Sequence, residues 1–279
     1  MVGGRATRAL VMGALTLLAV AWLVPLVWMV SMSLQPNDLL ARTTSNTAWG
    51  LLPIPFTTEN YERLLTFGLT PRWFLNSAIV ATSMTAVVWA LSTLAGYGFA
   101  RIPFRGRRVL YAFVLAGLVV PEQAIFIPLY TMFADWGWHN GYLALVAPRT
   151  AVPIGVFLMT QFFRGVPGYL EEAAMLDGAN RWTIFTRIML PLSVPASTTL
   201  AILTFLYAWN DYLWPLISAV QPEMFTITVG LASMQSNFAQ SEGLGRIMAS
   251  GVFASLPVVA LFLAFQRFVI RGIALGGGK

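Results

Sequence analysis

Six long apolar segments alternate with shorter polar stretches along the chain. A helix needs about 20 mostly apolar residues to cross the hydrocarbon core of a bilayer, and each segment reaches that length. The pattern therefore predicts an all-α integral membrane protein, with a single transmembrane domain that occupies residues 1–279. The six expected transmembrane helices lie at approximately 9–33, 75–100, 108–133, 141–163, 191–219 and 246–271.

The first apolar segment follows Arg5 and Arg8, as the apolar core of a signal peptide would. Its apolar run is longer than that of a usual signal peptide, so we expect an uncleaved first span. Between the first two spans, the stretch "PFTTENYERLL" at 55–65 predicts a short amphipathic helix.

Composition agrees with a membrane protein. Of the 279 residues, 57% are hydrophobic and only 10% are charged, and the mean hydropathy is +0.71. An average soluble domain is roughly 25% charged, so this chain lacks the charge to cover a water-facing surface. The formal net charge of +6 does not indicate nucleic acid, because the basic residues lie in short loops between apolar segments.

The basic residues also predict the orientation. Cytoplasmic loops of membrane proteins carry an excess of Lys and Arg. With the N-terminus in the cytoplasm, twelve basic residues face the cytoplasm and four face outside. Both termini and the loop 164–190 are therefore expected on the cytoplasmic side. The twelve are Arg5, Arg8, Arg101, Arg105, Arg107, Arg108, Arg164, Arg181, Arg187, Arg267, Arg271 and Lys279.

Several kinds of chemistry need residues that this sequence lacks. It contains no cysteine and a single histidine, His139, so a zinc-thiolate or multi-histidine metal site is excluded. The only lysine is Lys279, whereas a phosphate-binding P-loop needs its lysine in a glycine loop ahead of a helix. The chain is therefore not expected to be an enzyme or to hold a cofactor.

The polar loop 164–190, between the fourth and fifth expected spans, begins with a helix-forming stretch. Pro167 suits the start of a helix. Glu171 and Glu172 lie near the positive end of that helix, where carboxylates are favoured.

The second half of this loop predicts another short helix. Gly178 can end the first helix in a left-handed conformation. Asn180 can cap a second helix from about Arg181 to Met189, before Pro191. From physical chemistry alone, both a plain cytoplasmic connector and a functional surface remain open.

The same loop resembles a known signature. Glu172-Ala173-Ala174, then three residues, Gly178, nine residues and Ile188-Met189-Leu190-Pro191 match the EAA pattern, EAA-x3-G-x9-I-x-LP. That pattern is typical of the membrane permease subunits of binding-protein-dependent ABC importers. The "TTENY", "FRGRR" and "YAWNDYLWPL" stretches are similar to the carbohydrate-uptake class, in particular to the smaller permease of maltose-type and glycerol-3-phosphate-type importers.

The resemblance implies a task for the loop. In the family, this loop forms a coupling helix that sits in a groove of the ATPase subunit and transmits its ATP-driven closure to the spans. It also implies that the glycine-rich C-terminal tail "GIALGGGK" reaches the ATPase, although such a tail is typical of disorder as well. The residues expected to take part in ATPase coupling are Glu171, Glu172, Ala173, Ala174, Gly178, Ile188, Leu190 and Pro191.

The resemblance also implies partners. They are a second homologous permease, a dimer of ATPase subunits that holds ATP and Mg, an extracytoplasmic solute-binding protein, a sugar substrate and membrane lipid, with no nucleic acid. The expected location is the bacterial inner membrane, in a multi-pass arrangement. The sequence leaves open the identity of the solute and whether two copies of this chain form the pore.

Other functions compete with this interpretation. An ion-gradient-driven secondary transporter would explain the spans, but such proteins often contain internal repeats, and it leaves the EAA match unexplained. An ABC permease for a non-sugar solute such as glycerol-3-phosphate also remains open. A membrane-embedded enzyme ranks last, since the sequence offers no paired catalytic carboxylates and no nucleophile constellation.

Ionisable residues within the expected spans predict a solute pathway. A charge at the centre of a bilayer costs at least about 2.5–3.5 kcal/mol, so such groups face a partner or a watery cavity. Glu122 and Arg149 each follow a proline, where local unwinding would supply backbone polar groups. The alternative is that Arg149 and Asp211 only pair to hold helices, with the aromatic residues in an interface belt. The expected pathway residues are Glu122, Arg149, Tyr207, Trp209, Asn210, Asp211, Tyr212 and Trp214.

Overall fold

A computed structural model describes residues 4–38, 40, 55–66, 68–237 and 243–276. These residues form helices joined by turns, with no β-strand among them, which confirms the all-α expectation for this part of the chain. The helices are α1 (Arg5–Ser33), α3 (Glu59–Thr66), α4 (Thr70–Arg101), α5 (Arg107–Ala116), η1 (Glu122–Ile125), α6 (Phe126–Asp135), α7 (Tyr142–Val146), η2 (Ala147–Arg149), α8 (Pro153–Gly165), α9 (Tyr169–Leu176), α10 (Arg181–Ile184), η3 (Phe185–Met189), α11 (Leu190–Leu192), α12 (Val194–Trp209), α13 (Leu213–Ser218), η4 (Pro222–Met224), α14 (Ile227–Asn237) and α15 (Leu244–Gly276).

The chain divides into two compact units. Unit 1 comprises Met1–Pro71 and Gly230–Leu256, and unit 2 comprises Arg72–Val229 and Pro257–Lys279. Helices α1 and α3 therefore belong to unit 1, and the run from α5 to α13 belongs to unit 2.

In unit 1, the predicted amphipathic helix forms as α3, and it is hydrogen-bonded to the C-terminal end of α1. The side chain of Asn60 is buried, and its Nδ2 donates hydrogen bonds to the carbonyls of Ser33 and Gln35 at 2.9 and 2.8 Å. Its Oδ1 accepts a bond from Nδ2 of Asn37 at 2.9 Å. The amide of Asn60 thus joins α3 to the residues that follow α1.

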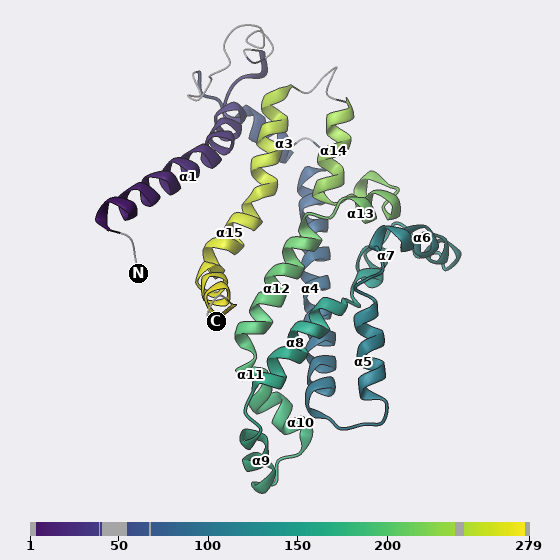
Figure 1. The fold of residues 1–279 in the computed structure, drawn as a ribbon. Coiled ribbons are helices and arrows are strands. Elements are labelled where there is room, and N and C mark those ends of the chain that lie inside the picture. The colour runs from purple at the N-terminus through teal and green to yellow at the C-terminus, as the bar shows by residue number, and fades with distance from the viewer. Residues whose placement is uncertain (1–3, 39, 41–54, 67, 238–242, 277–279) are drawn as a thin grey trace. The chain divides into compact units, whose positions relative to one another are not determined.

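In unit 2, long helices pack closely side by side. Figure 1 shows α4, α5, α8 and α12 alongside one another, with α9 and α10 at one end and α6, α7 and α13 at the other. A Cβ atom at Gly96 would lie 2.6 Å from Cβ of Met159 and 2.9 Å from the backbone nitrogen of Thr160. The absence of a side chain at Gly96 therefore lets α4 and α8 touch backbone to backbone.

By length and composition, three helices are candidate membrane spans: Thr7–Ser33, Thr70–Arg101 and Leu244–Gln266. Two bent pairs bring the number to five if each pair is one span. Tyr142–Arg149 and Pro153–Gly165 meet at 50°, and Arg181–Leu192 and Val194–Trp209 meet at 73°. The described helices therefore supply three to five candidate spans, against six expected.

The segment expected to form the third span, 108–133, is not one helix. Helix α5 ends at Ala116, and a turn and the short η1 precede α6. Pro121 at the start of η1 has no N–H to continue a helical ladder. The number of apolar residues along the sequence does not reveal this break, because the turn itself contains the apolar residues Leu118, Val119 and Val120.

The segment expected as the fifth span, 191–219, is also divided. Helix α12 ends at Trp209, and the chain turns before the short α13 begins at Leu213. At its other end, the bend near Ser193 separates α12 from α11. The prolines Pro191 and Pro195 flank this bend.

Candidate functional site

The polar loop folds into two short helices joined by a glycine turn. We call α9, α10 and η3, residues 169–189, the α9–α10 hairpin. Gly178 adopts φ +83° between the two helices, which confirms the predicted left-handed bend. Oδ1 of Asn180 accepts a hydrogen bond from the backbone N–H of Thr183 at 2.8 Å, which confirms the predicted N-cap.

The two carboxylates of α9 lie in different surroundings. Glu172 is exposed, whereas Glu171 is only 5% exposed. Oε1 of Glu171 lies 3.5 Å from Nε of Arg101, and its Oε2 lies 3.3 Å from Nη1 of Arg181. Only Glu172 of this pair presents its side chain to the surroundings of the chain.

The hairpin also exposes large apolar side chains. Leu176 is 90% exposed and Trp182 is 64% exposed, and Tyr169 and Met175 of the hairpin are exposed as well. Large apolar side chains that are exposed outside the membrane-spanning segments are typical of an interaction surface. Ala173 is exposed on the same helix, where its small side chain allows another surface to approach closely.

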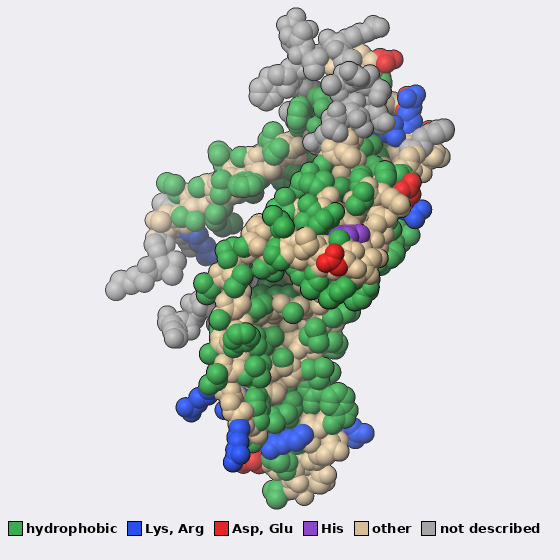
Figure 2. All heavy atoms as spheres, turned by 90° about the vertical axis from the view of Figure 1, so that its right-hand side faces the viewer, with side chains coloured by type: hydrophobic (Ala, Val, Ile, Leu, Met, Phe, Trp, Pro, Cys, Tyr) green, Lys and Arg blue, Asp and Glu red, His purple; other side chains and the backbone are tan. Residues whose placement is uncertain are grey.

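Basic side chains surround this end of unit 2. Figure 2 shows blue arginine side chains gathered at the end that carries α9 and α10, with a largely hydrophobic surface above them. This distribution matches a membrane-embedded wall with a polar end outside the lipid. The exposed arginines at this end are Arg105, Arg108, Arg164, Arg181 and Arg187.

The last three residues of the EAA match lie where the hairpin meets the bent helix pair. Ile188 belongs to the π-helical turn η3, and Leu190 and Pro191 belong to α11. The 73° bend follows directly after them. The structure thus brings the signature residues together in one hairpin and its connection to α12.

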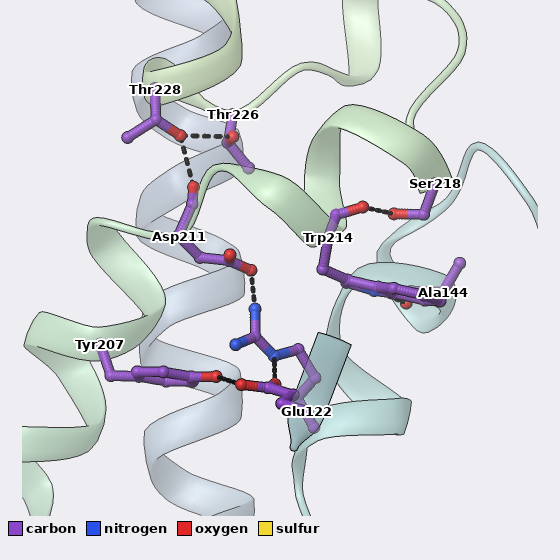
Figure 3. Close-up of polar contacts among 9 residues, drawn as sticks. Glu122, Ala144, Tyr207, Asp211, Trp214, Ser218, Thr226 and Thr228 are labelled. Carbon is purple, nitrogen blue, oxygen red and sulfur yellow. Dashed lines mark hydrogen bonds and ion pairs between the residues drawn. The ribbon is translucent and has the colours of Figure 1, made fainter. Parts of the chain in front are cut away.

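At the other end of unit 2, four of the expected pathway residues meet in a polar cluster. Nε of Arg149 lies 2.7 Å from Oε1 of Glu122, and the same guanidinium forms an ion pair with Asp211. The hydroxyl of Tyr207 donates a hydrogen bond to Glu122, and its ring lies 4.4 Å from Cζ of Arg149. Figure 3 shows these side chains converging from different elements.

The charged residues of this cluster lie at breaks between helices. Glu122 lies in η1 after Pro121, and Arg149 lies in η2 after Pro148, so the expected unwinding beside both prolines is present. Asp211 follows the end of α12, and its backbone carbonyl accepts a hydrogen bond from the hydroxyl of Thr228.

The remaining expected pathway residues separate into buried and exposed groups. Trp209 is buried and stacks on Phe205, with ring centroids 5.7 Å apart. Trp214 is fully buried, and its Nε1 donates a hydrogen bond to the carbonyl of Ala144 at 2.9 Å. Tyr212 and Asn210 are exposed, as is Tyr207.

Comparison with known proteins identifies the family. Residues 90–275 match the family described as binding-protein-dependent transport system inner membrane component. The chain belongs to this family. The membership indicated by the EAA signature is therefore confirmed.

Relatives of this permease carry sugar-transport names. It is 34% identical to the arabinooligosaccharides transport system permease protein AraQ of Bacillus subtilis (strain 168), over 94% of this chain and 92% of that protein. It is 32% identical to the trehalose/maltose transport system permease protein MalG of Thermococcus litoralis, over 97% and 96% of the two chains.

A solved structure shares the fold of the permease. A chain of a bacterial ABC transporter involved in the import of the acidic polysaccharide alginate matches it with a TM-score of 0.81. The match covers 96% of this chain and 99% of that chain, at 20% sequence identity.

Sequence reasoning missed two residues of the permease that the structure joins to Glu171. In the sequence, the charges of Arg101 and Arg181 indicate only the cytoplasmic side, a role that positive charges fill without any specific partner. Arg101 at the end of a long apolar helix and Glu171 at the start of a polar one are 70 residues apart. Their opposite charge alone does not predict contact.

Proposed function

We propose that this permease is the pore-forming subunit of an ATP-driven importer, which moves a sugar or oligosaccharide from a solute-binding protein into the cytoplasm by alternating access. The observation that carries the proposal is the α9–α10 hairpin, in which the EAA residues form an exposed helical tip around the left-handed turn at Gly178. The sugar-transport names of its relatives support the class of solute.

The proposed assembly contains several partners. ATP and Mg bind to a dimer of ATPase subunits, a second homologous permease completes the pore, and the solute-binding protein docks outside. The permease itself forms six spans in the bacterial inner membrane, with both termini in the cytoplasm. The third span is proposed to be the interrupted segment that comprises α5, η1 and α6.

At the cytoplasmic end, the hairpin transmits the movement of the ATPase. Glu172 contacts the ATPase groove, and the small side chains of Ala173 and Ala174 let the helix seat closely. The exposed Leu176 and Trp182 supply apolar contact area. Gly178 holds the bend, and the residues Ile188, Leu190 and Pro191 connect it to α12.

At the outer end, the polar cluster borders the solute pathway. Tyr207, Asn210 and Tyr212 offer exposed aromatic faces and an amide, which suit the CH patches and hydroxyl groups of a sugar. The buried Trp209 and Trp214 form the wall behind them, and Asp211, Glu122 and Arg149 fix its shape.

The charges of the cluster favour a neutral sugar over a phosphorylated solute. One guanidinium, that of Arg149, faces the two carboxylates of Glu122 and Asp211. Among the described residues of this cluster, no positive charge is left to bind a phosphate group, so glycerol-3-phosphate is the weaker candidate.

Reconstitution tests the proposed function. The permease is co-expressed with a candidate ATPase and a candidate second permease, purified, and placed in liposomes that contain ATP. We expect ATPase activity to rise when the sugar-loaded binding protein is added, together with uptake of labelled sugar. Uptake that follows an imposed ion gradient and needs no ATPase would instead establish a secondary transporter.

A further inference from the structure

One arginine joins the ends of two long helices in unit 2. Arg101 is the last residue of α4, and α8 ends at Gly165. Nε of Arg101 donates a hydrogen bond to the carbonyl of Phe163 at 2.9 Å, and its Nη2 donates to the carbonyls of both Phe163 and Val166. The carbonyl of Phe163 cannot receive a helical bond from Pro167, which has no N–H. The backbone N–H of Val166 donates to the carbonyl of Phe163 at 3.3 Å instead, and Arg101 adds side-chain donors to this carbonyl and to that of Val166 at the end of α8.

The same arginine reaches the α9–α10 hairpin through Glu171. The side chains of Arg101 and Glu171 are 15% and 7% exposed, and Nε of Arg101 lies 3.5 Å from Oε1 of Glu171. The second carboxylate oxygen lies 3.3 Å from Nη1 of Arg181, at the start of α10. One buried carboxylate thus connects α4 to both helices of the hairpin.

Aromatic packing closes the space beside this ion cluster. Tyr97 lies four residues before Arg101, so the two side chains share one face of α4. The ring of Tyr97 packs edge-on against Phe163 of α8, with ring centroids 5.8 Å apart. It also packs in a tilted arrangement against Phe185 of η3, with ring centroids 5.1 Å apart. The backbones of α4 and α8 are in contact at Gly96. The hairpin therefore packs, through Phe185, against two helices that are themselves in close contact.

We propose that Arg101 and Glu171 form a clamp that makes the α9–α10 hairpin, α4 and α8 move as one body. This inference rests on the proposed function, in which an ATPase displaces the hairpin. Chain continuity would deliver that displacement to α12, through a π-helical turn and a 73° bend, and to α8, through residues 166–168. The clamp adds a buried connection to α4, which no short chain segment joins to the hairpin, and a second connection to the end of α8. Arg101 and Glu171 are both positioning residues. Glu171 acts inside the permease and does not bind in the ATPase groove.

A neutral double variant separates transmission from folding. Removing one partner would leave a buried charge unpaired, whereas Arg101→Gln/Glu171→Gln removes both charges together. We expect this variant to assemble with the ATPase and to keep its stimulated ATP hydrolysis. Sugar taken up per ATP hydrolysed should fall about tenfold or more, within the usual range of coupling between sites. The matched control is Arg105→Gln/Glu223→Gln, which changes two exposed residues of the same charges outside the hairpin and should leave the uptake per ATP unchanged.

Spin labels measure the rigid connection directly, in the otherwise unsubstituted permease within its assembled complex. Labels on Phe104→Cys, just beyond α4, and Asp177→Cys, at the hairpin, should report one distance in nucleotide-free and ATP-trapped complexes. The neutral double variant should report a distance that changes between these states. A change in the unsubstituted permease would overturn the clamp, whether or not the double variant folds.

The uptake results separate this inference from the proposed function. Wild-type uptake per ATP in an assembled neutral double variant refutes the clamp alone. Loss of ATPase binding by a folded double variant also refutes it, since Glu171 would then contact the ATPase. A wild-type permease that binds no ATPase refutes the proposed function itself.

Discussion

Valine at Gly178 should uncouple the hairpin while leaving the membrane helices in place. Gly178 has φ +83°, and no atom lies within 4 Å of the position that a Cβ would occupy. The cost of the substitution is therefore conformational and not steric contact with neighbours. A left-handed conformation costs an L-residue about 1–2 kcal/mol, and β-branched residues tolerate it least. That cost changes the ratio of native to altered turn by about 5–30-fold.

A second glycine provides a matched control. Gly106, in the turn between α4 and α5, has φ +81°, and a Cβ added there would also meet no atom within 4 Å. Gly106→Val therefore introduces the same backbone strain outside the hairpin. The assay is uptake and bound ATPase per inserted permease, compared among wild type, Gly178→Val, Gly178→Asn and Gly106→Val.

We expect Gly178→Val to lose bound ATPase or uptake, and Gly178→Asn to lose less, because asparagine tolerates the left-handed region better. Gly106→Val should keep uptake per inserted permease close to wild type. Wild-type uptake by an assembled Gly178→Val complex would refute the reasoning, as would an equal loss in Gly106→Val.

Three further expectations concern the topology, the pathway and unit 1. In this cysteine-free chain, Ala179→Cys should be shielded from a membrane-impermeant thiol reagent in intact cells, whereas Gln235→Cys should react; the reverse pattern would overturn the orientation. Asn210→Ala and Asp211→Asn should reduce or alter sugar uptake while stimulated ATPase activity persists, and unchanged uptake in both would exclude a pathway role. Asn60→Ala should cost about 1–3 kcal/mol, since it removes a buried amide from three hydrogen bonds, and an unshifted thermal melting curve of the purified permease would contradict this.

Local sequence signals predicted the hairpin well. The left-handed turn at Gly178 and the cap at Asn180 depend on a few neighbouring residues, and both are present in the structure. The short helix in the outer stretch 55–65 depends on similarly local features, and it forms as α3. The meeting of Glu122, Arg149 and Asp211 could be inferred because uncompensated charges within apolar segments need partners.

Features that depend on three-dimensional packing were not accessible in the same way. The break after Ala116 lies in an apolar stretch, so composition does not distinguish it from a continuous span. The neighbouring carboxylates Glu171 and Glu172 look alike in sequence, and the contacts of the buried Glu171 with Arg101 and Arg181 arise only from the packing of distant segments. For Trp209 and Trp214, an aromatic residue near the end of a span is compatible with both a pathway and a packed interior.

Cross-linking from the hairpin tests the central claim, that the α9–α10 hairpin docks on an ATPase subunit. Ala173→Cys, an exposed position of α9, carries a benzophenone label. The matched label is on Glu223→Cys, which lies beside Asn76 near the start of α4, whereas the hairpin contacts Arg101 at the end of α4. Illumination of the assembled complex should join Ala173→Cys, and not Glu223→Cys, to the ATPase subunit, as read from the mass of the adduct. An ATPase adduct from neither position, or equally from both, would contradict the claim.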